Sequence, residues 1–180
     1  MNKKDKFLIL AITSPFFHKD EAKKITLLLE NGEADYIHIR KPGSSINEMR
    51  NLIKNISEEY HHVLKLHDHF DLAKEFKIGG VHLNSRNNFP PANIKSVSKS
   101  LHSLKELESA HFYDYVTISP VFNSISKKGY ESRFHFSDLV NAIKDKPNII
   151  ALGGVTPERI PLLKDSGFYG AAMLGYFFPD

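Results

Sequence analysis

The sequence predicts an α/β fold in which eight parallel strands alternate with helices and close into a single barrel. Two observations predict it. Short apolar runs and helical patterns alternate along the chain, which is typical of a parallel sheet. Near the end, one apolar run leads into Gly153-Gly154 and a second stops at Gly175, as in the last two units of such barrels. The 180 residues are few for this fold, whose lower limit is about 200, so we expect one domain over residues 1–180.

Eight apolar runs are the predicted strands. The first follows a basic start and is too short for the core of a signal peptide. The predicted strands are Phe7–Thr13, Tyr36–Arg40, Val63–Leu66, Gly80–Leu83, Val97–Ser100, Tyr115–Ser119, Ile149–Ala151 and Gly170–Met173.

Helical periodicity fills most of the intervals between these strands. The predicted helices are Asp20–Asn31, Ile46–Tyr60, Asp71–Phe76, Leu104–Ala110, Ser137–Lys144 and Thr156–Ser166. Asn and Pro dominate Asn87–Lys95, where we expect a turn in place of a helix. Only Leu174–Asp180 follows the last strand. The prediction is therefore a (β/α)8 TIM barrel whose eighth helix is short or missing.

The last residues of the chain are apolar, at Tyr176-Phe177-Phe178, and too few to cover the first and last strands as a helix would. An uncovered apolar surface favours self-association. We expect either a homodimer or a tail docked in that groove; a truncated chain is the alternative.

Composition and charge limit the classes of function. The chain contains no cysteine, which excludes disulfides and thiolate metal sites and fits a reducing, cytoplasmic compartment. No apolar run reaches the roughly 18 residues of a membrane span, so we expect no membrane partner. The net charge of +3 suits a small anionic substrate but lacks the basic stripe of a nucleic-acid binder.

The second predicted strand places a cation at the mouth of the barrel. Ile37 and Ile39 share one face of this strand, while His38 and Arg40 share the other. We expect the isoleucines to face the helices and Arg40 to point inward at the carboxyl end. An arginine there is a good phosphate ligand; a structural ion pair is the alternative.

Polar side chains also end the third and fourth strands. Asp68 lies between His67 and His69, where it could bind a metal ion or cap the following helix. His82 is expected to be a hydrogen-bonded histidine of the barrel interior.

The fifth strand ends at Ser100 and His102. Because Ser103 and Glu106 have the spacing of a capping box, Ser100 and His102 remain to face the mouth.

Two loops late in the chain suit an anion. The segment 119–129 is rich in Ser, Lys and Gly, a composition typical of a mobile loop that closes over an anion, although a solvated surface loop is the alternative. After Gly154, Thr156 is a predicted N-cap with Pro157 at the first helical position. Glycines and a helix start favour phosphate binding, and tight turns alone are the plainer interpretation.

In this order, the motifs resemble the thiamine phosphate synthase/TenI superfamily of TIM barrels over nearly the whole chain. The matching segments are His-Ile-Arg at 38–40, His-Asp-x-x-x-x-Ala at 67–73, Gly-Val-His-Leu at 80–83, Ser-x-His-Ser at 100–103, Ser-Pro-Val-Phe to Lys at 119–127 and Ala-Leu-Gly-Gly-Val at 151–155. Any one of them is weak, whereas the ordered set is specific.

This resemblance implies thiamine biosynthesis by transfer of hydroxymethylpyrimidine diphosphate onto thiazole phosphate. By the same resemblance, Arg40, Lys127 and the adjacent Lys41 would hold the diphosphate, Ser100 and His102 would complete the catalytic set, Asp68 and Asn87 would hold Mg²⁺, and Gly153, Gly154 and Gly175 would bind the thiazole phosphate.

The chain departs from both branches of the superfamily. Compared with the synthase pattern, Pro42 replaces a lysine, His67 replaces an asparagine and Asn87 replaces the second metal-binding aspartate. Pro120 stands where the tautomerase branch has its histidine. The leading hypothesis is a synthase-like transferase. The alternatives are a thiazole tautomerase that uses His102 or His38, and a non-catalytic binder or regulator.

Overall fold

The barrel expected from the sequence is present. In the computed structural model, which describes residues 6–123, 132 and 134–179, eight parallel strands form a closed barrel in chain order. Each strand end lies within one residue of its predicted position. The strands are β1 (Leu8–Ile12), β2 (Tyr36–Ile39), β3 (Leu64–Leu66), β4 (Gly80–Leu83), β5 (Val97–Leu101), β6 (Tyr115–Ile118), β7 (Ile149–Leu152) and β8 (Gly170–Met173).

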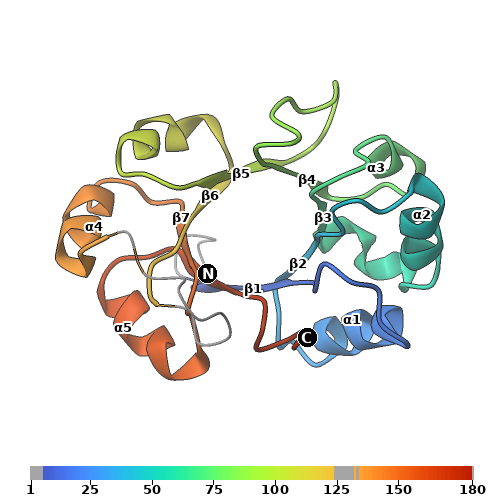
Figure 1. The fold of residues 1–180 in the computed structure, drawn as a ribbon, viewed down its shortest axis with the longest axis horizontal. Helices are drawn as coiled ribbons and strands as arrows, with labels where there is room; N and C mark the ends of the chain where they lie inside the picture. The colour runs from blue at the N-terminus through green and yellow to red at the C-terminus, as the bar shows by residue number, and fades with distance from the viewer. Residues whose placement is uncertain (1–5, 124–131, 133, 180) are drawn as a thin grey trace.

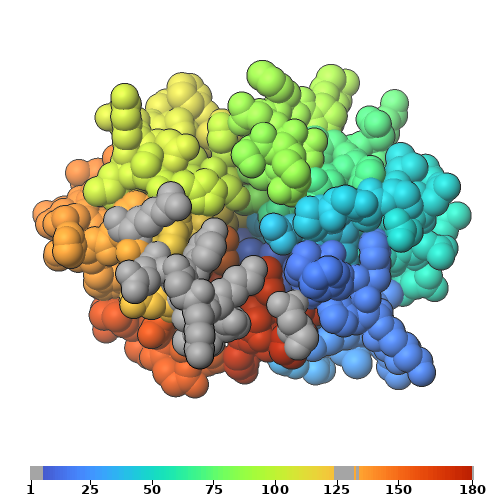
Figure 2. Space-filling view, in the orientation of Figure 1, coloured from blue at the N-terminus to red at the C-terminus, as the bar shows by residue number. Residues whose placement is uncertain are grey.

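Helices surround the strands (Figure 1). Figure 2 shows the same face in space-filling form, with the coloured segments following one another around the molecule. The α-helices are α1 (Glu21–Glu30), α2 (Ile46–Lys54), α3 (Leu72–Glu75), α4 (Phe136–Ile143) and α5 (Ile160–Asp165), and the 3-10 helices are η1 (Glu58–Val63), η2 (Lys105–Phe112) and η3 (Pro157–Arg159). None of these helices is long and apolar enough to cross a bilayer. Between β4 and β5 the chain forms no helix, as predicted for the Asn- and Pro-rich segment.

Three predicted helices differ in kind from those observed. The one expected over Thr156–Ser166 begins as the 3-10 helix η3 and continues as α5. The helix expected over Ile46–Tyr60 ends at Lys54, where Asn55 Nδ2 donates back to the Asn51 carbonyl at 2.8 Å and η1 begins after a short break. The one expected over Leu104–Ala110 is η2, a 3-10 helix, in which the Ser109 hydroxyl donates to Glu106 O at 2.7 Å. Side chains that compete for nearby backbone groups weaken an α-helix in this way.

The strands separate an outer apolar cluster from a mixed interior. Ile37 and Ile39 are fully buried against helix residues such as Met49, as predicted. Inside the barrel, Leu10, Ile12, Tyr115, Ile150 and Ala172 form a second, smaller cluster. The rest of the interior is polar, and these side chains are at most 2% exposed: His38, Lys65, His82, Ser98 and Thr117. The apolar part belongs mainly to β1, β7 and β8, and the polar part to β2–β6.

The tail takes the place of the eighth helix. Phe177 and Phe178 are buried in the outer cluster, and the Phe178 amide donates to the Leu174 carbonyl at 2.8 Å. Lys24 of α1 lies with its ammonium 5.1 Å from the centre of the Phe178 ring. Figure 1 shows the end of the chain beside α1. Of the two expectations for the tail, docking in the groove is therefore confirmed, and the homodimer stays a prediction.

Candidate active site

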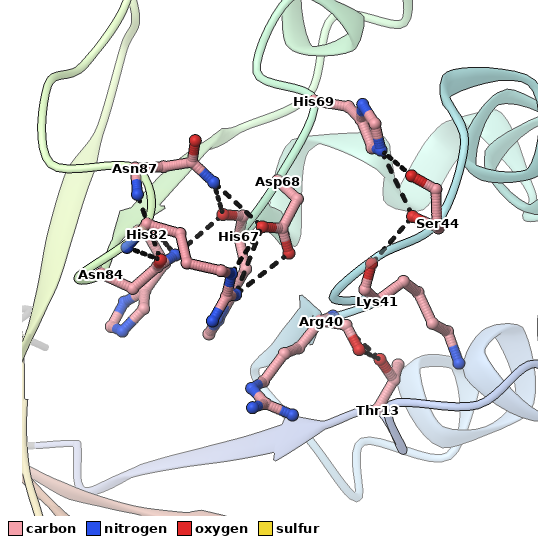
Figure 3. Close-up of polar contacts among 11 residues, drawn as sticks. Thr13, Arg40, Lys41, Ser44, His67, Asp68, His69, His82, Asn84 and Asn87 are labelled. Carbon is pink, nitrogen blue, oxygen red and sulfur yellow. Dashed lines mark hydrogen bonds and ion pairs between the residues drawn. The ribbon is translucent and has the colours of Figure 1, made fainter.

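Arg40 lies directly after β2, at the carboxyl end of the barrel. Its amide donates to Thr13 Oγ1 at 2.9 Å, which ties the end of β2 to the end of β1. The side chain is half-buried, and Figure 3 shows it turned away from Lys41. Burial lowers the pKa of His67, at the end of the neighbouring β3, and the charge of Arg40 adds to this shift. This position agrees with the predicted inward-facing arginine.

Lys41 does not have the position expected of a phosphate ligand. Its ammonium is fully buried, 2.6 Å from Glu21 Oε1, and it donates to the carbonyls of Ser14 and Phe16 at 2.8 and 2.5 Å. An ammonium has three donors, and these three acceptors use all of them. Burial lowers the pKa of Lys41, and the Glu21 carboxylate opposes that shift. Lys41 therefore joins the loops after β1 and β2 and is not available at the mouth.

Asp68, after β3, is the acceptor at the centre of a polar cluster (Figure 3). Its Oδ1 accepts from Arg86 Nε at 3.3 Å, from an Arg86 terminal nitrogen at 3.2 Å and from Asn87 Nδ2 at 2.9 Å. Asp68 is 8% exposed, so this cluster is largely withdrawn from water. The following helix α3 has Asp71 at its N-cap, so Asp68 is not a helix cap.

Side-chain hydrogen bonds fix the loop after β4, which carries Arg86 and Asn87. Asn84 Oδ1 accepts from the amides of both residues, at 3.0 and 3.2 Å. Asn84 Nδ2 donates to the His67 carbonyl at 2.8 Å, and Asn87 Nδ2 donates to the same carbonyl at 3.0 Å. The loop after β4 is thus fixed to the end of β3. This arrangement brings together the two residues, Asp68 and Asn87, that the sequence proposed as metal ligands.

The described residues of this cluster fit a Mg²⁺ site poorly. Asn87 lies against two acceptors, Asp68 Oδ1 and the His67 carbonyl, so its NH₂ group must face them and its oxygen points elsewhere (Figure 3). Mg²⁺ requires oxygen ligands, and one carboxylate remains. The Arg86 guanidinium already neutralises that carboxylate. A divalent cation at this place would meet a like charge.

Three histidines form a buried network below this rim. His38 Nδ1 lies 2.9 Å from His67 Nε2, and His38 Nε2 lies 2.7 Å from the Tyr115 hydroxyl. His82 contacts the hydroxyls of Ser98 and Ser100, both at 2.8 Å, which confirms it as a hydrogen-bonded interior histidine.

Burial keeps the network neutral at physiological pH. Desolvation lowers the pKa of His82 to about 3, and it holds the pKa values of His38 and His67 well below the ordinary range. One ring nitrogen from each histidine lies within 4.8 Å of the other two, which is a spacing that could accept a transition metal. Nearby Lys65 adds a positive charge and also lowers the pKa of His38 and His82. The arrangement suits a neutral hydrogen-bonding wall better than a cation site.

Ser100 and His102 differ in their surroundings. Ser100 is half-buried on His82, whereas His102 is exposed, with its Nδ1 atom 3.2 Å from the Ser119 hydroxyl. The Glu106 amide donates to Ser103 Oγ at 3.3 Å, as in the predicted capping box, but the N-cap of η2 is Leu104 and not Ser103. The Glu106 carboxylate also accepts from the His102 amide at 2.7 Å, which fixes the backbone of this histidine.

The Gly153-Gly154 loop is packed against the segment after β6. Both glycines have positive φ, +93° and +62°. A Cβ on Gly154 would lie 2.3 Å from the Asn123 carbonyl oxygen, and one on Gly153 would lie 2.7 Å from Pro120 Cα. The Phe122 amide donates to the Gly153 carbonyl at 3.0 Å. Close packing alone therefore requires glycine at both positions.

The remaining predicted residues of this region are placed only in part. Thr156 has the extended backbone of an N-cap, with Pro157 directly after it. Arg159 donates to the Gly154 carbonyl and lies over the Phe122 ring. Gly175 is half-buried after β8. Lys127 and most of the predicted anion-closing loop lie outside the described residues.

Two grooves of about 830 and 590 Å³ lie outside the barrel. They are lined by helices α1 and α2 and by the segments around them, and no strand end contributes to either. We place the site at the carboxyl ends of the strands because the polar residues converge there and barrels of this type bind ligands there.

Sequence reasoning missed two residues of the site. Arg86 is the one arginine in the polar loop that follows β4. Its place directly after a strand could have identified it as a candidate site residue. Glu21 begins α1 and gave no signal, because an acidic residue in a first helical turn is common on surfaces. Only the fold brings it to Lys41.

The chain is similar to known proteins over almost its full length. Residues 9–176 match the model of a family described as thiamine monophosphate synthase. A putative thiamine-phosphate synthase of Aquifex aeolicus is 29% identical over 154 residues, covering 78% of this chain and 81% of that protein. A thiamine-phosphate synthase of Caldivirga maquilingensis is 30% identical over 169 residues, covering 87% and 80%. The solved structure of a thiamine phosphate pyrophosphorylase from Bacteroides thetaiotaomicron superimposes with a TM-score of 0.80 and 38% identity, covering 94% of this chain and 83% of that one.

Proposed function

Because this chain belongs to the thiamine monophosphate synthase family, we propose that it joins a pyrimidine diphosphate to a thiazole phosphate in thiamine biosynthesis. The observation that carries the proposal is the position of Arg40. Arg40 directly follows β2 at the carboxyl end of the barrel, and its charge contributes to lowering the pKa of the buried His67 at the end of β3. An anionic leaving group would meet a cation there with little competition from water.

The proposed reaction needs stabilisation of a departing diphosphate. The C–O bond between the pyrimidine methylene and the diphosphate breaks, and its electron pair leaves with the diphosphate oxygen. The thiazole nitrogen then donates its lone pair to the methylene carbon, and a C–N bond forms. Arg40 would hold the developing negative charge by charge-assisted hydrogen bonds. We propose Lys127 as a second cation, as the resemblance implies.

We assign the remaining groups by their positions. Ser100, half-buried on His82, would hydrogen-bond the pyrimidine substrate at the floor of the site. The backbone at Gly153, Gly154 and Gly175 would receive the thiazole phosphate, which is small and anionic. Both assignments are extensions of the family resemblance and are part of the proposal.

A second candidate is a thiazole tautomerase. The observation that favours it is His102, an exposed imidazole at the end of β5 held by contacts with Ser119. A base must lie within hydrogen-bond reach of the proton that it removes, and this position at the mouth allows that. A third candidate is a binder without turnover, supported by Pro42 and Pro120 at positions where the two branches have reactive residues.

One experiment separates the three candidates. The purified protein is incubated with pyrimidine diphosphate and thiazole phosphate, and separately with thiazole carboxylate phosphate, each with Mg²⁺ and with chelator. The proposal expects a coupled product and one inorganic diphosphate per turnover from the first mixture. Isomerisation in the second mixture alone would replace it with the tautomerase. Binding of thiazole phosphate by calorimetry without any turnover would replace it with the non-catalytic binder.

A further inference from the structure

Arg86 forms an ion pair with Asp68 in which both carboxylate oxygens take part. Its Nε and one terminal nitrogen approach Oδ1 at 3.3 and 3.2 Å, and the terminal nitrogen also lies 3.4 Å from Oδ2. The carboxylate side chain is 12% exposed, whereas the arginine side chain is 44% exposed. Asp68 thus anchors an arginine side chain that remains partly exposed.

Two guanidinium groups come from segments that are joined to the end of β3. Arg40 directly follows β2, whose Ile39 carbonyl accepts from the His67 amide at 3.1 Å, and Arg86 forms an ion pair with Asp68. Arg40 comes from the end of β2, and Arg86 from the loop after β4. Two cations at the ends of neighbouring barrel segments, with one carboxylate beside them, can bind an anion with more than one negative charge.

The same cluster lacks the donors of a magnesium site. Asn87 presents hydrogen-bond donors to Asp68, and Arg86 occupies the side of the carboxylate that a cation would need. Arg86 therefore places a positively charged group with several N–H donors where a divalent ion would otherwise lie beside Asp68. An arginine can bind two phosphate oxygens at once and stays protonated at all physiological pH values.

We infer that Arg86, positioned by Asp68, is a diphosphate-binding residue that replaces the metal ion expected of this family, so that the protein binds diphosphate without Mg²⁺. The inference deepens the proposed function and rests on it for the identity of the substrate. In the transfer reaction, Arg40 and Arg86 would together receive the negative charge that forms as the C–O bond breaks. No redox step and no additional co-reactant is needed.

The test uses inorganic diphosphate as the probe and the full chain as the protein. Affinity is measured by calorimetry with Mg²⁺ and with chelator. The wild type is expected to bind with chelator, within about threefold of its affinity with Mg²⁺. Loss of a charge-assisted contact should make Arg86→Gln bind about 10- to 100-fold more weakly.

Arg50→Gln is the matched control. Arg50 forms an ion pair of the same kind with Glu75, at 2.8 and 3.0 Å, but on the outer surface of α2. Its loss should leave diphosphate affinity unchanged. Binding by the wild type only when Mg²⁺ is present would overturn the inference, as would equal affinity in Arg86→Gln and the wild type.

A second variant tests the exchange of a guanidinium for a metal site directly. Arg86→Gln combined with Asn87→Asp removes the cation and adds a carboxylate beside Asp68. Two carboxylates with a diphosphate are a good Mg²⁺ environment. Diphosphate should bind to this double variant at least tenfold more tightly with Mg²⁺ than with chelator. The same small Mg²⁺ effect as in the wild type would contradict the inference.

Failure of the inference and failure of the proposed function give different results. If coupled product forms only with Mg²⁺, the proposed function holds and the role of Arg86 is wrong. If no product forms under any condition but diphosphate binding depends on Arg86 and not on Mg²⁺, the anion site is real and the proposed transfer reaction is wrong.

Discussion

The rim above β2–β4 and the rim above β6–β8 are built from different parts of the chain. Over β2–β4, long charged side chains make the contacts, as in the pair of Asp68 with Arg86. Over β6–β8, backbone lies against backbone, and Gly153 and Gly154 have no space for a Cβ. A side chain can be shortened without moving the chain that carries it, whereas a tightly packed backbone cannot change alone. We therefore expect that substitutions on the first rim can change activity without changing stability. On the second rim, substitutions should change both.

The barrel interior repeats this division. Below the first rim lie His38, His67 and His82, neutral and hydrogen-bonded. Below the second rim lie apolar side chains such as Ile150 and Ala172. An apolar interior is insensitive to pH, while buried imidazoles stabilise the fold only as long as they remain neutral. The two halves should therefore respond differently to acid.

The largest expected effect is acid destabilisation through the histidine network. The pKa of His82 is about 3 in the fold and about 6.5 when the chain is unfolded, so the unfolded chain binds the proton more tightly. Stability is therefore complete above pH 6.5 and is lost as the pH falls toward 3. His82 alone should cost about 1.4 kcal/mol per pH unit below 6.5, approaching roughly 4 to 5 kcal/mol at pH 3. His38 and His67 add in the same direction.

Denaturant unfolding at a series of pH values between 6.5 and 5 measures this effect, because most carboxylates titrate lower. In His82→Asn, the free energy of unfolding should depend less steeply on pH, because one proton fewer is taken up on unfolding. His111→Asn, at an exposed position on η2, is the control and should leave it unchanged. A free energy of unfolding that stays constant from pH 6.5 to 5 would contradict the neutral network.

The next largest effect is expected for Arg40, on the first rim, above β2–β4. Arg40→Gln removes a cation that the proposed reaction needs, so turnover should fall by about 10²- to 10³-fold. The hydrogen bond from Arg40 to Thr13 uses the main chain and survives the substitution. Stability should therefore change by less than about 1 kcal/mol. Steady-state kinetics and thermal unfolding of the same preparation measure the two quantities. Parallel losses of turnover and stability would break the comparison, because this rim would then also be structural.

A smaller effect is expected for Gly154, on the second rim, above β6–β8. Gly154→Ala combines a positive φ with a Cβ placed 2.3 Å from the Asn123 oxygen. Gly32→Ala is the matched control, because Gly32 has φ +67° and nothing within 4 Å of its Cβ position. The control should lose about 1 kcal/mol from backbone strain alone, and Gly154→Ala should lose about 1 to 3 kcal/mol more from the collision. Chemical denaturation measures both. Equal losses would show that the loop is free to move and that the second rim is not rigid.

The difference between the two rims also explains what the sequence could predict. Periodicity located every strand because alternation of apolar residues depends on local sequence alone, and so Ile37 and Ile39 faced the helices as expected. The sequence also predicted the inward side of His38 and Arg40, which follows from the same alternation. It predicted Asp68 as a polar residue of the site because the residue ends a strand.

What the sequence could not predict depends on contacts between distant segments. Lys41 is beside Arg40 in the chain, yet Glu21 withdraws it from the mouth. Asn87 is near Asp68 as expected, but the His67 carbonyl and Asp68 together determine which end of its amide faces inward. The sequence predicted a cap or a metal site at Asp68, and the observed partner is Arg86. A residue's neighbours in the chain do not reveal which charge will oppose it in the fold.

The smallest expected effect concerns His102, at the border between the two rims. Its backbone is fixed by Glu106 and its ring contacts Ser119, so His102→Ala removes a side chain and leaves the loop in place. In the proposed transfer the diphosphate leaves as an anion and the thiazole nitrogen attacks, so neither step requires this imidazole as a base. Turnover of the coupled reaction should change by less than about threefold, whereas removal of a general base typically costs about 10²- to 10⁴-fold. Kinetics of both candidate reactions in the same variant provide the measurement. If His102→Ala abolishes isomerisation of the thiazole carboxylate phosphate, and the wild type forms no coupled product, the reactive group belongs to the end of β5 and the arginines after β2 and β4 only bind the phosphate.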